Sequence, residues 1–180
     1  MLLLRRGLLL FPAAAEGVAL LCLPELCFSG YQLEDRVQWP EVAEMSWRCL
    51  QELARCAPET ALWAGLPVDL DGLLYNGLAL LWGGAVRGVV LKRFLPSYSV
   101  FYEGRNFTPW RGRSPAECRG VPAGDLLFRL PFGDLSAQIC EDAWVWPQEN
   151  LPLLLRAQVL ANASASPFSL FKPEIGRAHV

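Results

Sequence analysis

Three residues of reactive type stand where apolar, strand-like runs of the sequence end. Glu25 follows "GVALLCLP", Lys92 follows "GAVRGVVL", and Cys140 follows "LSAQI". A carboxylate, an ammonium group and a thiol can together carry out acyl transfer without histidine. The carboxylate takes the thiol proton, and the ammonium group lowers the thiol pKa and stabilises the oxyanion. Because α/β proteins bind substrates at strand ends, this pattern favours a nucleophilic Cys140.

Each of these residues also has an ordinary structural interpretation. Cys140 could be a core thiol, because free cysteine is among the most buried residue types. Glu25 could be a solvated loop carboxylate, and Lys92 a surface lysine whose stem covers apolar side chains. The neighbours of Cys140 favour the chemical interpretation. Glu141 and Asp142 place charge at the end of an apolar strand, which is costly without a purpose.

Composition excludes several classes of function. The 180 residues suffice for one domain with a sizeable core, and the net charge of −2 argues against a nucleic-acid partner. No apolar run reaches the roughly 18 residues of a membrane-spanning helix. The six cysteines form no CxxC pair, so we expect no metal site and a reduced, cytoplasmic chain. The only histidine is His179, which leaves Ser–His and Cys–His catalysis almost nothing to use.

The surrounding sequence predicts one main helix and several strands. Residues 40–57 have helical periodicity between Pro40 and Pro58. The apolar face expected for this helix consists of Val42, Met45, Cys49, Leu50, Leu53 and Cys56. The apolar runs that predict strands are 17–23, 60–66, 75–82, 85–91, 126–130, 135–140 and 157–161.

Turns and loops connect these elements. Gly83-Gly84 predicts a hairpin, and Gly133-Asp134 predicts a second turn. Residues 94–123 are rich in Pro, Gly, Arg and aromatic residues, so we expect a long ordered loop there. Loops of that length inside a compact domain are more often functional than idle. With a short helix over 151–156, the mixture indicates one layered α/β domain.

Several segments together resemble the carbon–nitrogen hydrolase (nitrilase) superfamily, whose signature is a Glu-Lys-Cys triad. They are "LPELCFSGYQLED", "KRFLPSYSVFYEGRNF" and "QICEDAW". The patterns Gly-Tyr-x-x-Glu-Asp, Leu-Pro-x-Tyr, Ile-Cys-Glu-Asp and "NASASPFSLFK" narrow the resemblance to the glutaminase domain of glutamine-dependent NAD⁺ synthetases. The resemblance implies an α/β fold, a four-layer αββα nitrilase-like sandwich. It also implies that Glu25 is the general base, Lys92 the catalytic lysine and Cys140 the nucleophile.

The resemblance also implies how a substrate is bound. Tyr98, Ser166 and Lys172 match positions that bind glutamine in this subgroup, and Lys172 would offer a cation to the substrate carboxylate. Glu103 and Glu141 would orient the lysine and the substrate amine. Ordinary loop packing is the alternative for Tyr98 and Ser166.

Both ends of the chain depart from the family pattern. The family's first strand should precede "AAAEGVALLCLPEL", and later strands should follow, so we expect an incomplete sandwich. The N-terminal "MLLLRRGLLLFPAAAEG" imitates a signal peptide, but "GVALLCL" continues directly as a strand, which favours an altered start. The sequence predicts a partial hydrolase domain over residues 1–174, with the synthetase domain absent. Residues 175–180, "IGRAHV", are what the sequencing adapter ATCGGAAGAGCACACGTC encodes, so we expect a non-native tail.

The expected function is hydrolysis of glutamine to glutamate and ammonia through a cysteine thioester. The ammonia would serve ATP-dependent NAD⁺ synthesis from deamido-NAD⁺, with ATP and Mg²⁺ as cofactors of the absent synthetase domain and none here. The expected partners are glutamine, the synthetase domain of the same full-length chain and, when intact, further copies in a homo-oligomer, but no nucleic acid or membrane. The alternatives are a stand-alone amidase of the superfamily and an inactive partial product.

Overall fold

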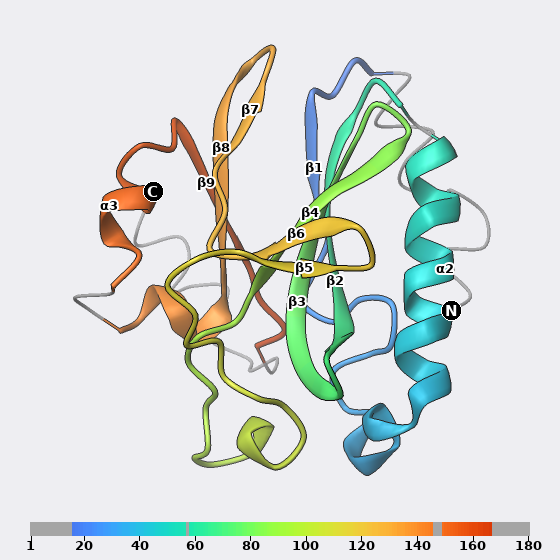
Figure 1. Cartoon of the computed structure of the whole chain (residues 1–180), viewed down its shortest axis with the longest axis vertical. Helices are drawn as coiled ribbons and strands as arrows, with labels where there is room; N and C mark the ends of the chain where they lie inside the picture. The colour runs from blue at the N-terminus through green and yellow to red at the C-terminus, as the bar shows by residue number, and fades with distance from the viewer. Residues whose placement is uncertain (1–15, 57, 146–148, 167–180) are drawn as a thin grey trace.

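Two β-sheets lie face to face, with helix α2 (Pro40–Cys56) outside one sheet and the short helix α3 (Leu151–Leu154) beside the other (Figure 1). This arrangement comes from a computed structural model, which describes residues 16–56, 58–145 and 149–166. It confirms the predicted four-layer α/β architecture. None of the helices in these residues is long and apolar enough to cross a membrane.

The larger sheet has six strands in the order β1-β2-β3-β4-β6-β5. In that order their bounds are Leu20–Cys22, Ala61–Leu70, Leu73–Trp82, Ala85–Leu91, Val121–Gly124 and Ala116–Cys118. Strand β1 pairs parallel with β2, and β4 pairs parallel with β6. The remaining neighbours are antiparallel, including the predicted hairpin of β3 and β4. This sheet carries the first two reactive strand ends, those of β1 and β4.

The smaller sheet has three strands in the order β7-β8-β9, with bounds Phe128–Leu130, Gly133–Ile139 and Val159–Ala163. Strand β8 pairs antiparallel with β7 and parallel with β9. Gly133, predicted in the turn, is instead the first residue of β8, because the turn lies at residues 131–132. This sheet carries the third reactive strand end, that of β8.

Strand β2 is buried on both faces. Leu62 and Leu66 pack in the same core as Leu50 of α2, whereas Trp63 packs in the core between the two sheets. The rings of Trp63 and Phe128 meet edge to face, with their centroids 5.5 Å apart. Burial on both faces explains why the sequence of this strand is apolar without alternation.

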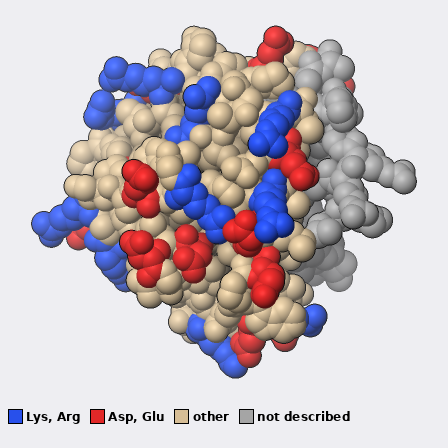
Figure 2. Space-filling view, turned by 45° about the vertical axis from the view of Figure 1, so that its right-hand side comes forward, with Lys and Arg blue, Asp and Glu red and all other residues tan. Residues whose placement is uncertain are grey.

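Helix α2 confirms the predicted helix but only part of the predicted face, in which Leu50 and Leu53 are buried as expected. Met45 is 49% exposed and Cys56 is also exposed, whereas Ala43, Trp47 and Ala54 are buried. Small side chains on the inner face let the helix backbone approach the sheet, and that advantage is not visible in apolar periodicity. The outer face carries charges: Glu44 pairs with Arg48 and Arg119. Figure 2 shows acidic and basic side chains interspersed on this side of the molecule.

The segment 94–123 is not one loop, as the sequence had suggested. It contains the 3₁₀ helix η3 (Glu103–Arg105) and the antiparallel hairpin of β5 and β6. These strands have only three and four residues, and Pro122 lies within β6, so no alternating pattern marks them. The part before the hairpin remains irregular and brings η3 back toward the strand ends.

Candidate active site

Glu25 is held in a turn that crosses strand β2 at Gly65. The turn is fixed there by backbone hydrogen bonds from Leu23 N to Trp63 O (2.8 Å) and from Phe28 N to Gly65 O (3.2 Å). A Cβ atom on Gly65 would lie 2.3 Å from Leu26 N and 2.8 Å from the Glu25 carbonyl carbon. Glycine is therefore required for this close approach, and the approach places the Glu25 carboxylate inside the protein.

Lys92 directly follows β4, and its side chain is fully buried between two carboxylates. Its Nζ atom donates to Glu25 Oε1 and to Glu103 Oε1, at 2.7 Å each. Asn76, on the neighbouring strand β3, donates from Nδ2 to the same Glu25 oxygen, also at 2.7 Å. The other Glu25 oxygen accepts from Ala165 N at 3.1 Å. Charge burial on this scale is tolerated only because these groups are paired.

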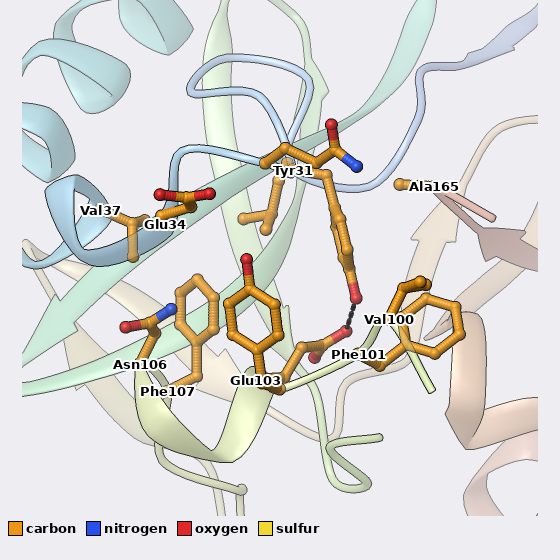
Figure 3. Close-up of a pocket in the computed structure, with 12 residues that line it drawn as sticks. Tyr31, Glu34, Val37, Val100, Phe101, Glu103, Asn106, Phe107 and Ala165 are labelled. Carbon is orange, nitrogen blue, oxygen red and sulfur yellow. Dashed lines mark hydrogen bonds between the residues drawn. The ribbon is translucent and has the colours of Figure 1, made fainter. Parts of the chain in front are cut away.

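The second carboxylate that contacts Lys92 belongs to Glu103, the first residue of η3. Tyr31 Oη donates to Glu103 Oε1 at 2.5 Å, a contact visible in Figure 3. Both side chains line a cavity of about 330 Å³, together with Val100, Phe101 and Ala165 among others. The second Glu103 oxygen is buried and accepts no hydrogen bond from the described residues. Tyr31 and Lys92 thus hold one carboxylate oxygen from two directions.

The charges of this cluster fix the protonation state of the lysine. Burial alone would lower the pKa of Lys92, but Glu25 and Glu103 outweigh it, so that its pKa is raised. Burial raises the pKa of Glu103, and the negative charge of Glu25 adds to this effect. Burial and the contact with Glu103 also raise the pKa of Tyr31 far above its usual range. Lys92 is therefore a cation at neutral pH and cannot be the base.

Cys140 follows β8 and opens the 3₁₀ helix η4 (Cys140–Ala143) with a φ of 45°. This left-handed conformation is uncommon outside glycine, and strain of this kind concentrates at functional sites. The thiol is mostly buried, and its Sγ atom accepts from Ser164 Oγ at 3.3 Å. Since Ala165, the next residue, donates to Glu25, the segment after β9 connects the thiol with the carboxylate.

Tyr98 and Glu141, two of the predicted substrate-binding residues, contact each other near the surface. Tyr98 is 56% exposed, and its Oη donates to Glu141 Oε2 at 2.9 Å. Ser166 is also exposed, and its Oγ lies 2.8 Å from Ser164 Oγ, next to the thiol. Lys172 lies outside the described residues. The structure therefore gathers Glu25, Lys92, Glu103 and Cys140 inside, with Tyr98, Glu141 and Ser166 toward solvent.

Three residues of this site were given no role of their own in the sequence analysis, namely Asn76, Tyr31 and Ser164, although the last two belong to quoted patterns. Asn76 had a signal, because it is the one polar side chain in the apolar run "LLYNGLALLW", and a buried amide must find a partner. Tyr31 and Ser164 lie in segments without periodicity, so only the folded chain shows their contacts. Within the described residues, no group of three His, Cys, Asp or Glu side chains is arranged to hold a metal ion.

Curated relatives named glutamine-dependent NAD(+) synthetase match most of the chain. No family model matches the chain. The glutamine-dependent NAD(+) synthetase of Mycobacterium tuberculosis is 35% identical over 169 residues, which cover 88% of this chain and 25% of the relative. That of Aquifex aeolicus is 32% identical over 163 residues, covering 88% and 26%. The chain thus spans about a quarter of the length of the curated relatives it matches.

Solved structures agree with this similarity. A glutamine-dependent NAD(+) synthetase from Cytophaga hutchinsonii superimposes with a TM-score of 0.82 at 32% identity, over 94% of this chain and 28% of that one. A carbon-nitrogen hydrolase from Helicobacter pylori gives a TM-score of 0.68 at 24% identity, over 97% and 59%, which concerns the fold alone. The chain is therefore a relative of one part of the glutamine-dependent NAD(+) synthetases, with the fold of the nitrilase-superfamily carbon–nitrogen hydrolases.

Proposed function

We propose that this chain is the glutaminase part of a glutamine-dependent NAD⁺ synthetase and hydrolyses glutamine to glutamate and ammonia. The observation that carries the proposal is the buried Lys92 ammonium, 2.7 Å from both Glu25 and Glu103. The segment after β9 links this cluster to the Cys140 thiol, because Ser164 donates to the thiol and Ala165 to Glu25. A cation, a base and a thiol are the groups that acyl transfer from an amide requires. The shared name of the relatives supplies glutamine as the amide.

The first half of the reaction forms a thioester. Glu25 takes the proton of Cys140, and the thiolate attacks the side-chain carbonyl carbon of glutamine. Lys92 stabilises the oxyanion that develops as the C–S bond forms. When this intermediate collapses, the C–N bond breaks, and the nitrogen leaves as ammonia with the proton returned by Glu25. Glutamyl thioester remains on Cys140.

The second half returns the free enzyme. Glu25 takes a proton from water, whose oxygen attacks the thioester carbon, and the C–S bond then breaks. Glutamate leaves and Cys140 regains its proton, so the overall change is one glutamine and one water to glutamate and ammonia. Glu103 and Tyr31 keep Lys92 in place during both halves, since Glu103 bonds the Lys92 Nζ and Tyr31 bonds Glu103.

The surface residues suit the free end of the amino acid. The Glu141 carboxylate would accept hydrogen bonds from the substrate ammonium group, while Tyr98 fixes its orientation at 2.9 Å. Ser166 and Lys172 complete the proposed site, with Lys172 facing the substrate carboxylate. These contacts leave the side-chain amide of glutamine pointing inward toward Cys140.

In the longer protein, the ammonia would be used by a synthetase domain that amidates adenylated deamido-NAD⁺, with ATP and Mg²⁺ bound there. The relatives extend well beyond the matched quarter, which leaves room for such a domain. The six cysteines are free, which suits a cytoplasmic location. We further propose that the intact protein is a homo-oligomer.

Hydroxylamine trapping tests this function in the full-length protein that contains this chain. We expect glutamine to yield glutamate and, with hydroxylamine present, γ-glutamyl hydroxamate, because hydroxylamine attacks the thioester in place of water. Both products are measured by mass spectrometry. Hydrolysis of simple aliphatic amides without any of glutamine would contradict the proposal and favour a stand-alone amidase.

Gly65→Ala is expected to disturb the base without touching any reacting group. The new methyl group would meet backbone atoms of the turn that carries Glu25, and backbone cannot give way as a flexible side chain does. We expect a stability loss of about 1–3 kcal/mol. The kcat for glutamine should also fall by about 10²-fold, because Glu25 is displaced. Urea unfolding and steady-state kinetics measure the two effects.

Gly88→Ala is the matched control for that substitution. Its Cβ would lie 2.9 Å from Leu126 Cδ1 and 3.0 Å from Phe128 Cε1, both of them side-chain atoms of the core between the sheets. We expect a comparable stability loss but nearly unchanged kcat. Equal kcat values for the two variants would show that Gly65 has no special relation to Glu25.

A further inference from the structure

Asp142 is a buried carboxylate that accepts hydrogen bonds from two separate segments of the backbone. Its Oδ1 atom accepts from Arg93 N at 3.0 Å and from Phe94 N at 2.9 Å. Its Oδ2 atom accepts from Ile139 N at 3.2 Å. The bond to Ile139 is local and caps the short helix η4. The bonds to Arg93 and Phe94 cross to another part of the fold and need a different explanation.

The two segments carry the ammonium group and the thiol. Arg93 immediately follows Lys92, and Ile139 immediately precedes Cys140. Lys92 ends a strand of the six-stranded sheet, whereas Cys140 ends a strand of the three-stranded sheet. No ladder of strand hydrogen bonds joins β4 to β8, because these strands belong to different sheets. The Asp142 carboxylate makes the backbone connection that the sheets do not.

We propose that Asp142 is a positioning residue that sets the distance between Lys92 and Cys140 by tying together the backbone ends of their strands. The inference rests on the proposed roles of Lys92 and Cys140 in amide hydrolysis. Asp142 itself does not act on the substrate. It acts through Lys92 and Cys140, which must reach the same carbonyl group of the substrate. The Cys140 thiolate attacks the carbonyl carbon, and the Lys92 ammonium hydrogen-bonds the oxyanion that develops.

The environment of Asp142 suits this role. Burial raises its pKa to about 6, against the lowering effect of the backbone N–H groups and Lys92. At neutral pH it is therefore a carboxylate, with acceptors on both oxygens. The positive φ of Cys140 is unfavourable and persists only where neighbouring contacts hold it. The hydrogen bond from Ile139 N to Asp142 is such a contact, because it joins the residues on either side of Cys140.

Asp142→Asn tests the proposal in the full-length protein. An amide keeps the size of the side chain but has one acceptor oxygen, so at least one of the two segments faces an N–H donor and is released. We expect the kcat for glutamine to fall by about 10²-fold while KM stays within about threefold, because misplacement affects the reaction more than binding. Ammonia-dependent NAD⁺ formation should remain, which reports that the rest of the protein is folded.

Asp134→Asn is the matched control, since Asp134 lies on β8, the strand that leads into η4, and its carboxylate makes only a weak ion pair, at 3.9 Å, with Arg129. It should leave kcat and KM unchanged. Equal kcat losses in the two variants, or a rise in KM alone in Asp142→Asn, would overturn the proposal. If Asp142 served stability alone, Asp142→Asn would lower the melting temperature, but the folded enzyme would not show a lower kcat at an unchanged KM.

Two further measurements do not depend on glutamine hydrolysis. Alkylation of Cys140 by iodoacetamide, followed by peptide mass spectrometry, should be slower in Asp142→Asn than in wild type and Asp134→Asn, because Lys92 no longer assists the thiolate. Unchanged alkylation would overturn the proposal even if the natural substrate were another amide.

If Asp142→Asn does not fold, amide hydrogen exchange of the wild type decides: the backbone N–H groups of Arg93 and Phe94 should be as protected as those of strand residues. Rapid exchange at both would sink the idea.

Discussion

Cys140→Ala is expected to abolish glutamine-dependent NAD⁺ formation by the full-length protein and to leave ammonia-dependent formation intact. The Cys140 thiol is the nucleophile of the proposed reaction, and the only histidine of the chain, which could activate a serine instead, is His179. Without a thiol the covalent route is lost, and we expect a loss of glutaminase kcat of about 10⁴-fold or more. Supplied ammonia bypasses this step. Product NAD⁺ is measured with glutamine or with ammonium chloride as the nitrogen source.

Cys118→Ala is the control for that prediction. Cys118 is a buried thiol of β5 whose Sγ atom donates to Asp69 O at 3.6 Å, and burial raises its pKa. Such a thiol is unreactive, so both nitrogen sources should still serve this variant. Glutamine use by Cys140→Ala at the wild-type rate would refute the assignment of the nucleophile. Loss of both activities in Cys140→Ala would instead indicate damage to the fold.

The strand ends could be predicted from the sequence because their signal is local. The runs before Glu25, Lys92 and Cys140 are short and mostly apolar, and a charged residue marks the end of each, at Glu25, Lys92 and Glu141. Short, largely apolar runs bounded by polar residues are typical of strands, so the strand ends can be placed from the sequence. In the structure, Lys92 contacts Glu25 directly at 2.7 Å, although the two residues are 67 positions apart.

The rest of the site depends on contacts that have no local signal. Tyr31 meets Glu103 across 72 positions, and both residues lie outside regular strands. The link from Glu25 to Ala165 spans 140 positions and uses a backbone N–H, which every residue but proline possesses. The predicted face of α2 was wrong at Met45 and Cys56 for a related reason. Small residues such as Ala43 and Ala54 gain from close packing, which periodicity of large apolar side chains does not reveal.

Lys92→Met is expected to have the largest effect on stability. Methionine fills a similar volume, but it leaves Glu25 and Glu103 buried without the cation that both contact at 2.7 Å. Removal of one partner from a buried ion pair leaves an uncompensated charge, at a cost of about 3–5 kcal/mol. Glutamine hydrolysis should be lost as well, because the oxyanion has no cation. Urea unfolding followed by circular dichroism measures the stability.

Arg48→Met is the matched control, because it also replaces a paired cation by methionine. The Arg48 side chain is 70% exposed, and its partner Glu44 lies one helical turn away at 3.1 Å. Surface pairs of this kind contribute about 0.3–0.5 kcal/mol, so the control should unfold almost as the wild type does. A stability loss in Lys92→Met no larger than in Arg48→Met would mean that Glu25 and Glu103 are not charged together in the folded protein.

The stability of Lys92→Met should depend on pH, because the substitution leaves the Glu103 carboxylate buried without its cation. In the wild type, burial already raises the pKa of Glu103, and Lys92 opposes that rise. Without Lys92 the folded pKa of Glu103 rises further above its unfolded value. A carboxyl with a raised folded pKa stabilises the protein at low pH, and that stabilisation is lost as the pH increases. The stability deficit of Lys92→Met should therefore be larger at about pH 8 than at about pH 5. A deficit that is independent of pH would point to lost packing of the lysine stem, rather than to the charge of the ammonium group, as the contribution of Lys92.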